Sequence, residues 1–397
     1  MAVADVKVNA PLPFDTDLLD RLLDDAGIDV IVATSKHNVQ YLLGGYRFFF
    51  FDTMDAIGTS RYLPALVYQK GNPENAAYIG VSMENFEKDL GKFWPATLDL
   101  SNTGSKSAGE RALAHIKKLG NVRRIAVESG FIPADAEAVL RNGLPNCDVV
   151  DAVFPLERLR ARKSPREIAY LRESSERVVD AMLTVFRTHC VPGATKLDIA
   201  EAMRREEVNR GLVFDYLLVT AGTSLNRAPS EHRLADGDIM SLDSGGNYKG
   251  YIGDLCRMGI IGGKPDAELE DLLGLVEDIQ QAVRAPIAAG HRGGDICDVG
   301  ERMVAASKHA PYLHFQAHGM GLVTHEAPRL MDTPRLSYMG YDKERPLESG
   351  MVVSIETTMA HPKRGFVKLE DTILVTDTGH EALGDGGRGW NAAGGGR

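Results

Sequence analysis

The fold of this chain is decided by residues 238–258, DIMSLDSGGNYKGYIGDLCRM, which have the pattern of two short strands around a turn. Three glycines and an asparagine in the middle favour a turn, and the apolar residues on both sides favour strands. A turn centred between Tyr248 and Lys249 places Asp243 opposite Asp254, with their Cβ atoms about 5 Å apart. Two carboxylates this close repel each other unless a proton or a cation lies between them. The segment therefore predicts a metal site.

A second pair of acidic residues repeats this arrangement nearer the C-terminus. Glu356 and Glu370 lie in two strand-like segments that flank the turn-like sequence HPKRG at 361–365. Their midpoint, residue 363, falls inside that turn, so we expect these two glutamates to face each other as well. The sequence HGMGLVTHEAP at 318–328 lies between the two hairpins and adds an imidazole.

Four carboxylates and one imidazole form an oxygen-rich ligand set. Such a set suits two divalent ions that share bridging ligands about 3.5 to 4 Å apart. It does not select one metal, so Mn, Co, Fe and Zn all stay candidates. We therefore expect two divalent metal ions as cofactors.

The order and spacing of these residues resemble those of the pita-bread metallohydrolases, the superfamily of methionine aminopeptidase, prolidase, aminopeptidase P and creatinase. An aspartate is followed by a second one eleven positions later, then by HGMG, by another histidine seven positions after the first, and by Glu and Glu-Asp-Thr. The resemblance implies five metal ligands, of which the second aspartate and the last glutamate bridge the two ions: Asp243, Asp254, His318, Glu356 and Glu370.

The same resemblance implies catalytic roles. Glu356 corresponds to the glutamate that contacts the metal-bound water and moves its protons, and His325 to the histidine that hydrogen-bonds the substrate carbonyl. A further histidine is expected after an Asn-x-x-x-Pro segment. In the sequence NRAPSEH, that place is taken by Ser230 or by His232, and we favour His232. Lys368 stands where prolidase-like enzymes have an arginine, and it cannot make the same bidentate bonds.

The resemblance implies a hydrolase that cleaves a peptide or peptide-like amide bond in a small substrate, as Xaa-Pro dipeptidases and aminopeptidases do. The departures at Ser230 and Lys368 leave a second interpretation open, in which the same fold acts on a small non-peptide zwitterion. That enzyme would resemble ectoine hydrolase, creatinase or a dimethylsulfoniopropionate lyase. A binding protein that has lost catalysis is disfavoured, because all five ligand types are present.

The length of 397 residues is typical of two domains and leaves room for a third. Up to about residue 155, helical and strand-like segments alternate, which indicates an α/β domain. This part resembles the N-terminal domain of creatinases and prolidases. We place that domain at 1–157 and an α+β pita-bread catalytic domain at 158–397. The glycine-rich end from Gly384 onward predicts a mobile tail.

Composition and charge exclude several classes of protein. The net charge of -10 argues against a nucleic-acid-binding surface. No run approaches the roughly 20 apolar residues that span a membrane, and the first residues lack the basic start and apolar core of a secretion signal. We therefore expect a cytoplasmic enzyme, without nucleic-acid or membrane partners, that acts on a small molecule or a short peptide.

The run Phe48–Phe51 has two interpretations. A strand or loop packed on both sides accounts for four consecutive phenylalanines, and so does an interface where the rings overhang the active site of a partner subunit. Related two-domain enzymes are commonly dimers of the second kind. We therefore expect a homodimer.

Overall fold

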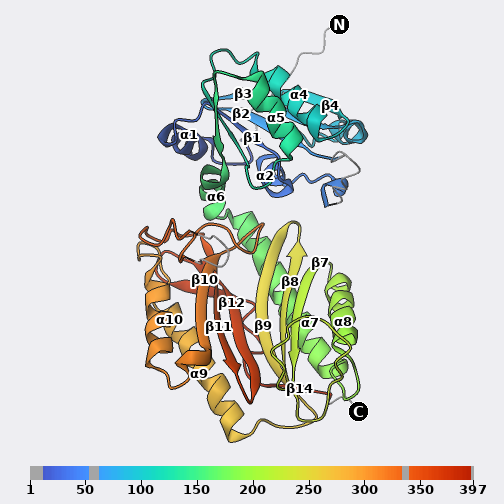
Figure 1. Ribbon diagram of the computed structural model, residues 1–397, viewed down its shortest axis with the longest axis vertical. Coiled ribbons are helices and arrows are strands. Elements are labelled where there is room, and N and C mark those ends of the chain that lie inside the picture. Colours follow the sequence, from blue (N-terminus) through green and yellow to red (C-terminus); the bar gives the residue numbers. More distant parts are fainter. Residues whose placement is uncertain (1–11, 53–61, 333–338, 395–397) are drawn as a thin grey trace. The chain divides into compact units, whose positions relative to one another are not determined.

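The computed structural model describes residues 12–52, 62–332 and 339–394, which form two compact units (Figure 1). The chain passes from one unit to the other after Leu159. The domain boundary expected from the sequence, after residue 157, lies two positions earlier. Across the described ranges, no helix combines the length and the apolar character that membrane crossing requires.

The N-terminal unit contains a six-stranded mixed sheet. Its strands are β1 Val30–Ala33, β2 Ala65–Gln69, β3 Asn72–Val81, β4 Thr97–Asn102, β5 Arg124–Val127 and β6 Asp148–Asp151. Its helices are α1 Thr16–Asp25, α2 Lys36–Leu42, η1 Phe49–Asp52, η2 Ser82–Glu84, α3 Asn85–Lys88, α4 Ser105–Ile116, α5 Ala134–Gly143 and α6 Val153–Ala161. The strand order is β4-β3-β2-β1-β5-β6, in which β1 runs antiparallel to β2 and parallel to β5.

Successive residues of β1 support the two faces of this sheet. Ile31 packs with Leu19 of α1 and Val39 of α2 in one hydrophobic cluster. Its neighbour Val32 packs with Ala112 of α4 in another. Because side chains alternate along a strand, these clusters lie on opposite faces, and helices cover both. This arrangement confirms the expected α/β class of the N-terminal unit.

The phenylalanine run does not form a strand. Phe48 and Phe51 are buried, whereas the side chain of Phe49 is 64% exposed. Phe50 stacks on Tyr62, with ring centroids 4.7 Å apart. Phe49–Asp52 form the 3₁₀ helix η1, in which successive side chains point about 120° apart, so the rings spread in several directions. The homodimer stays a prediction.

The C-terminal unit contains an eight-stranded sheet and four α-helices in the described ranges. Its strands are β7 Val213–Ala221, β8 Ile239–Tyr248, β9 Tyr251–Ile261, β10 Leu313–Gly319, β11 Val352–His361, β12 Gly365–Val375, β13 His380–Leu383 and β14 Asn391–Ala393. Its helices are α7 Pro165–Thr188, α8 Lys196–Asn209, α9 Ala267–Arg284, α10 Asp295–Ala306 and η3 Ala310–Tyr312. The main strand order is β10-β11-β12-β9-β8-β7; β13 pairs with β12, and β14 pairs with β9.

Helices α7 and α9 pack against one face of this sheet. Val178 of α7 belongs to the same hydrophobic cluster as Leu242 of β8, and Val276 of α9 to the same cluster as Ile355 of β11. The next residue along each of these strands is acidic and points to the other face, because side chains alternate. The helices therefore leave a polar face of the sheet on which charged side chains can converge.

The glycine-rich end is ordered through Gly394, so the prediction of a mobile tail is wrong for the described residues. The last strand, β14, pairs in parallel with β9. Arg257 of β9 is fully buried and donates hydrogen bonds to the carbonyl oxygens of Gly386 (2.6 Å) and Gly384 (2.8 Å). A Cβ atom on Gly384 would meet Ser175 O at 2.7 Å, so glycine permits this close approach. Residues 395–397 lie outside the described ranges.

Candidate metal centre

The turn of the first hairpin lies one residue later than the sequence predicted. Lys249 (φ 54°) and Gly250 (φ 97°) form a two-residue turn between the paired residues Tyr248 and Tyr251. Hairpin turns with positive φ at both central positions match the twist of the flanking strands. A lysine rarely adopts positive φ, so the residue type at position 249 did not indicate this turn.

This shift changes the partners of both aspartates. Asp243 of β8 pairs with Cys256 of β9, and Asp254 of β9 pairs with Gly245 of β8. The predicted direct opposition of Asp243 and Asp254 is therefore wrong. The two aspartates are offset by two residues, which keeps both carboxylates on the same face of the sheet.

The second hairpin has the predicted register. Glu356 of β11 pairs directly with Glu370 of β12. β12 also pairs with β9, where Glu370 lies opposite Cys256. Asp243, Cys256, Glu370 and Glu356 thus form one row across four adjacent strands. Burial raises the pKa of the Cys256 thiol well above its usual range, so the thiol is neutral in this structure.

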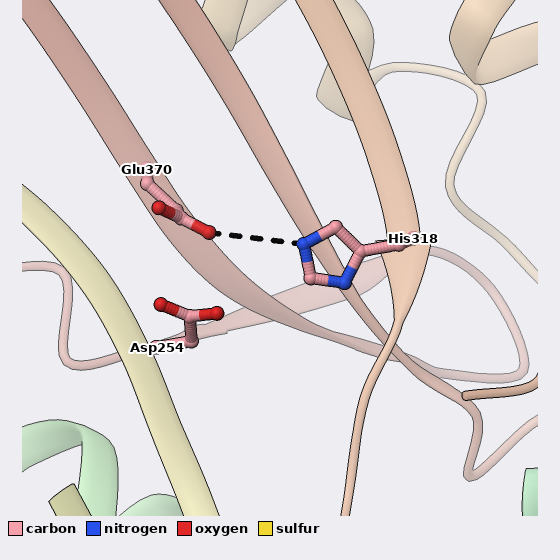
Figure 2. Close-up of side chains that lie close together, drawn as sticks. All are labelled: Asp254, His318 and Glu370. Carbon is pink, nitrogen blue, oxygen red and sulfur yellow. Dashed lines mark ion pairs between the residues drawn. The ribbon is translucent and has the colours of Figure 1, made fainter. Parts of the chain in front are cut away.

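The next row on the same face contains the remaining residues that the sequence predicted as ligands. Asp254 lies two residues before Cys256, and His318 lies two residues after Gln316, which pairs with Glu356. Figure 2 shows Asp254, His318 and Glu370 converging from three strands. One ligand atom from each of these three residues lies within 4.8 Å of the others, a spacing that can hold a metal ion.

His318 is oriented as a metal ligand would be. Its Nε2 atom is buried and makes no hydrogen bond with the described residues, while Nδ1 lies 3.2 Å from Gly319 O. Nε2 points toward Glu356 Oε1 at 3.6 Å and Glu370 Oε1 at 3.8 Å. Burial opposes a charge on His318, but these two carboxylates raise its pKa to about 10. A positive charge is therefore favoured at the position of this nitrogen, and a divalent ion would supply it.

The carboxylates are crowded as well as buried. Burial, followed by the charges of Glu370 and Asp243, raises the pKa of Asp254 well above its usual range. Asp243, also buried, has its pKa raised to about 6, mainly by burial. Repulsion of this kind falls when a cation lies between the acids. The donor set thus fits the divalent ions that the sequence predicted.

One cation of the chain itself lies inside this acidic group. The ammonium of Lys368 is 2.7 Å from Asp243 Oδ2, 2.6 Å from Glu356 Oε2 and 2.8 Å from Glu370 Oε2. Arg227 also donates a short hydrogen bond to Asp243 Oδ2. Sequence reasoning noted the unusual identity of Lys368 but not its position, and it missed Arg227 altogether.

The two histidines assigned to catalysis have different surroundings. The His325 ring stacks on the His318 ring, with centroids 3.9 Å apart and planes at 20°. Burial and the charge of His318 lower the pKa of His325 to about 4, so its imidazole is neutral. His232 is exposed, and its backbone exchanges hydrogen bonds with Ser230 and Lys196. Within the NRAPSEH segment, Arg227 is the residue whose side chain reaches a ligand carboxylate.

Tyr216 is another site residue that sequence reasoning missed. Its hydroxyl donates a short hydrogen bond to Asp254 Oδ1. A Cβ atom on Gly245 would lie 2.3 Å from the Tyr216 ring, so glycine is needed for this contact. The available signal was a glycine inside a strand, which often marks a close approach, but the sequence had been interpreted as a turn there.

A buried acid supports the ligand hairpin from the helix side. The Ser244 hydroxyl lies 2.7 Å from Tyr216 O and 2.8 Å from Glu207 Oε1. A hydroxyl has one proton to donate, so both bonds form at once only if Glu207 is protonated and donates to Ser244. Burial raises the pKa of Glu207 to about 8, which agrees with this assignment.

We expect Glu207→Gln to stabilise the protein at high pH. Because the folded pKa lies above the unfolded value, the stability that protonated Glu207 contributes is present below about pH 4.5 and is lost as pH rises through 8. The glutamine amide imitates the protonated acid at every pH. The variant should melt within about 2 °C of wild type at pH 5 and at least about 5 °C higher at pH 9.

Glu201→Gln on the same helix is the matched control, because Glu201 is exposed. Its melting temperature should follow that of wild type at both pH values. Parallel pH profiles for wild type and Glu207→Gln would contradict a protonated Glu207.

A network of one aspartate and three arginines fixes β12 on the face opposite the proposed metal centre. Asp371, next to the candidate ligand Glu370, contacts Arg257 (3.1 Å), Arg284 (3.1 Å) and Arg388 (2.5 Å). Burial alone would raise the pKa of Asp371, but the arginines hold it below its usual range. Arg257 also donates to Glu370 O at 2.8 Å. The backbone that carries Glu370 is therefore fixed by charge-assisted hydrogen bonds.

Comparisons with known proteins agree with this arrangement. Residues 16–162 match the creatinase/prolidase N-terminal domain, and residues 169–377 match metallopeptidase family M24. An uncharacterised peptidase of Bacillus subtilis, YqhT, is 28% identical over 269 residues, which are 66% of this chain and 73% of the relative. The Xaa-Pro dipeptidase of Pyrococcus horikoshii is 24% identical over 376 residues, which are 91% of this chain and 94% of the relative.

A solved structure has the same fold. The Xaa-Pro dipeptidase from Bacillus anthracis superposes with a TM-score of 0.79 at 21% sequence identity, covering 95% of this chain and 98% of that chain. The expected pita-bread fold with a creatinase-type N-terminal domain is confirmed. Because the family match at residues 169–377 spans more than half of the sequence, the chain belongs to metallopeptidase family M24.

Proposed function

We propose that this metal-dependent hydrolase cleaves the amide bond of a short peptide with proline after the scissile bond, as an Xaa-Pro dipeptidase or aminopeptidase does. The observation that carries the proposal is the buried group of Asp254, His318 and Glu370, whose ligand atoms converge within 4.8 Å. Curated relatives and structural neighbours named Xaa-Pro dipeptidase support the choice of substrate.

The proposed ligand set has five members. Enzymes of this family use two divalent ions, and the carboxylates and imidazole here suit Mn, Co, Fe or Zn. Bound divalent ions would polarise the substrate carbonyl and lower the pKa of water. The residues that we assign to metal binding are Asp243, Asp254, His318, Glu356 and Glu370.

Two further roles follow from the charge states of the side chains. Lys368 and His318 outweigh burial and hold the pKa of Glu356 well below its usual range, so this carboxylate is ionised. We assign it the transfer of protons from the attacking water because of the resemblance at this position. The neutral imidazole of His325 can donate one hydrogen bond to a substrate carbonyl oxygen. His232 stays a prediction as a residue that contacts the scissile amide.

A substrate panel tests the proposed specificity. Manganese-loaded protein should hydrolyse Ala-Pro or an Xaa-Pro tripeptide at least about 100-fold faster than ectoine, creatine or dimethylsulfoniopropionate, because only the peptides place an amide carbonyl beside the centre. Product release measured by mass spectrometry distinguishes these reactions. Turnover of a zwitterion alone would replace the peptidase proposal with the alternative C–N hydrolase or lyase.

The homodimer and the cytoplasmic location also stay predictions. The exposed ring of Phe49 supports an interface between two copies, and sedimentation of the purified protein would test it. The residues that bear on a secretion signal, 1–11, lie outside the described ranges. Fractionation of cells that produce the protein tests its location, and the acidic net charge of -10 supports the absence of nucleic-acid partners.

A further inference from the structure

Lys368 occupies the interior of the proposed metal centre. It lies on β12 two residues before Glu370, so both side chains point to the same face of the sheet. Only 3% of Lys368 is exposed. Its ammonium has three N–H donors, and three carboxylates lie within 2.8 Å of its nitrogen. The ammonium is thus fully coordinated by oxygens of the ligand set.

The ligand oxygens divide between two cation positions. Glu370 directs Oε2 to Lys368, while its Oε1 accepts a hydrogen bond from Ser354 (2.9 Å) and lies 3.8 Å from His318 Nε2. Asp243 and Glu356 each give one oxygen to Lys368. Asp254, His318 and one oxygen of Glu370 remain as a compact group for a divalent ion.

The charges of this buried centre balance with one divalent ion. Once metal binding has displaced the protons of Asp254 and His318, the four carboxylates carry four negative charges, and Lys368 and Arg227 together supply two positive ones. One divalent ion completes the neutralisation. A second divalent ion would leave two positive charges in excess if Lys368 and Arg227 stayed in place. Uncompensated charge in a buried site costs free energy.

We propose that the Lys368 ammonium occupies one of the two cation positions of this centre, in place of a metal ion. One divalent ion binds tightly at Asp254, His318 and Glu370. The second ion binds much more weakly, because it has to displace Lys368 from Asp243 and Glu356. Lys368 thereby sets a stepwise order of metal loading. This inference rests on the ligand set of the proposed hydrolase.

Titration of the metal-free full-length protein with Mn(II) tests this order of loading. The six-line electron paramagnetic resonance signal of dissolved Mn(II) reports the free ion, so the bound number per chain follows without any activity assay. In wild type, the first Mn(II) should bind at least about 100-fold more tightly than the second, since a unit charge a few ångströms away strongly opposes the second ion.

Lys368→Met keeps a long side chain but removes the charge. The second Mn(II) should bind this variant at least about tenfold more tightly than it binds wild type. Lys363→Met is the matched control, because Lys363 is exposed in the turn of the same hairpin. Its two affinities should equal those of wild type. Far-ultraviolet circular dichroism verifies that each variant is folded.

The outcomes separate this inference from the proposed function. If the two Mn(II) affinities of wild type differ less than tenfold, the proposed role of Lys368 is wrong. This result needs no variant. An unchanged second site in folded Lys368→Met also overturns it, while the metal hydrolase stands. If wild type binds no Mn(II), Co(II), Fe(II) or Zn(II) at all, the metal centre itself is wrong and the proposed function fails with it.

Discussion

Asp254→Asn is expected to lower kcat/KM at least about 1,000-fold, about 4 kcal/mol, and to remove most of the bound metal. Asp254 is buried and belongs to the compact group with His318 and Glu370. The amide keeps the shape of the side chain but removes its negative charge and one acceptor oxygen. The measurements are metal content by elemental analysis and kcat/KM for an Xaa-Pro dipeptide.

His325→Ala is the matched comparison, because it separates a loss of turnover from a loss of metal. His325 stacks on the proposed ligand His318 and lies outside the group of Asp254, His318 and Glu370, so this variant should retain its metal and lose about 100-fold in kcat. Normal metal content in Asp254→Asn together with metal loss in His325→Ala would show that the two roles are misassigned.

Removal of the metal should abolish activity and also lower the melting temperature. A ligand that binds only the folded state adds about 3 kcal/mol of stability at 100 times its dissociation constant. For a unit of the size of residues 160–397, which carries the site, that corresponds to roughly 5 to 10 °C. Chelation followed by dialysis should remove both activity and this stability, and Mn(II), Co(II), Fe(II) or Zn(II) should restore them.

The Asp254→Asn variant serves as the control for the thermal shift. Its melting temperature should hardly respond to Mn(II), because it lacks a ligand of the compact group. Full activity in wild-type protein whose metal content has been verified as negligible would refute a metal-dependent mechanism.

The convergence of the proposed ligand residues could be predicted in part, because strand pairing converts sequence spacing into spatial proximity. The midpoint of Glu356 and Glu370 fell within their turn, and the two residues do pair. In the first hairpin, the same reasoning placed the turn one residue too early. There the turn depends on a positive φ at Lys249, which residue type alone did not indicate.

Other features depended on contacts between distant segments. The sequence shows that Lys368 is two residues from Glu370, but only three-dimensional packing brings its ammonium to Asp243. Arg227 reaches the same carboxylate from a separate segment. The glycine content suggested a mobile tail because it indicates only local backbone freedom. It does not show that the buried Arg257 needs the carbonyl groups of this segment as hydrogen-bond partners.

The ordered glycine-rich end has a practical consequence for anyone shortening the gene. A stop codon before position 384 would delete the carbonyl groups that satisfy Arg257 and the guanidinium of Arg388 that satisfies Asp371. Arg257 lies on β9 and Asp371 on β12, the strands that carry the proposed ligands Asp254 and Glu370. We expect such a product to accumulate in inclusion bodies, and the soluble yield beside that of the full-length protein measures the effect.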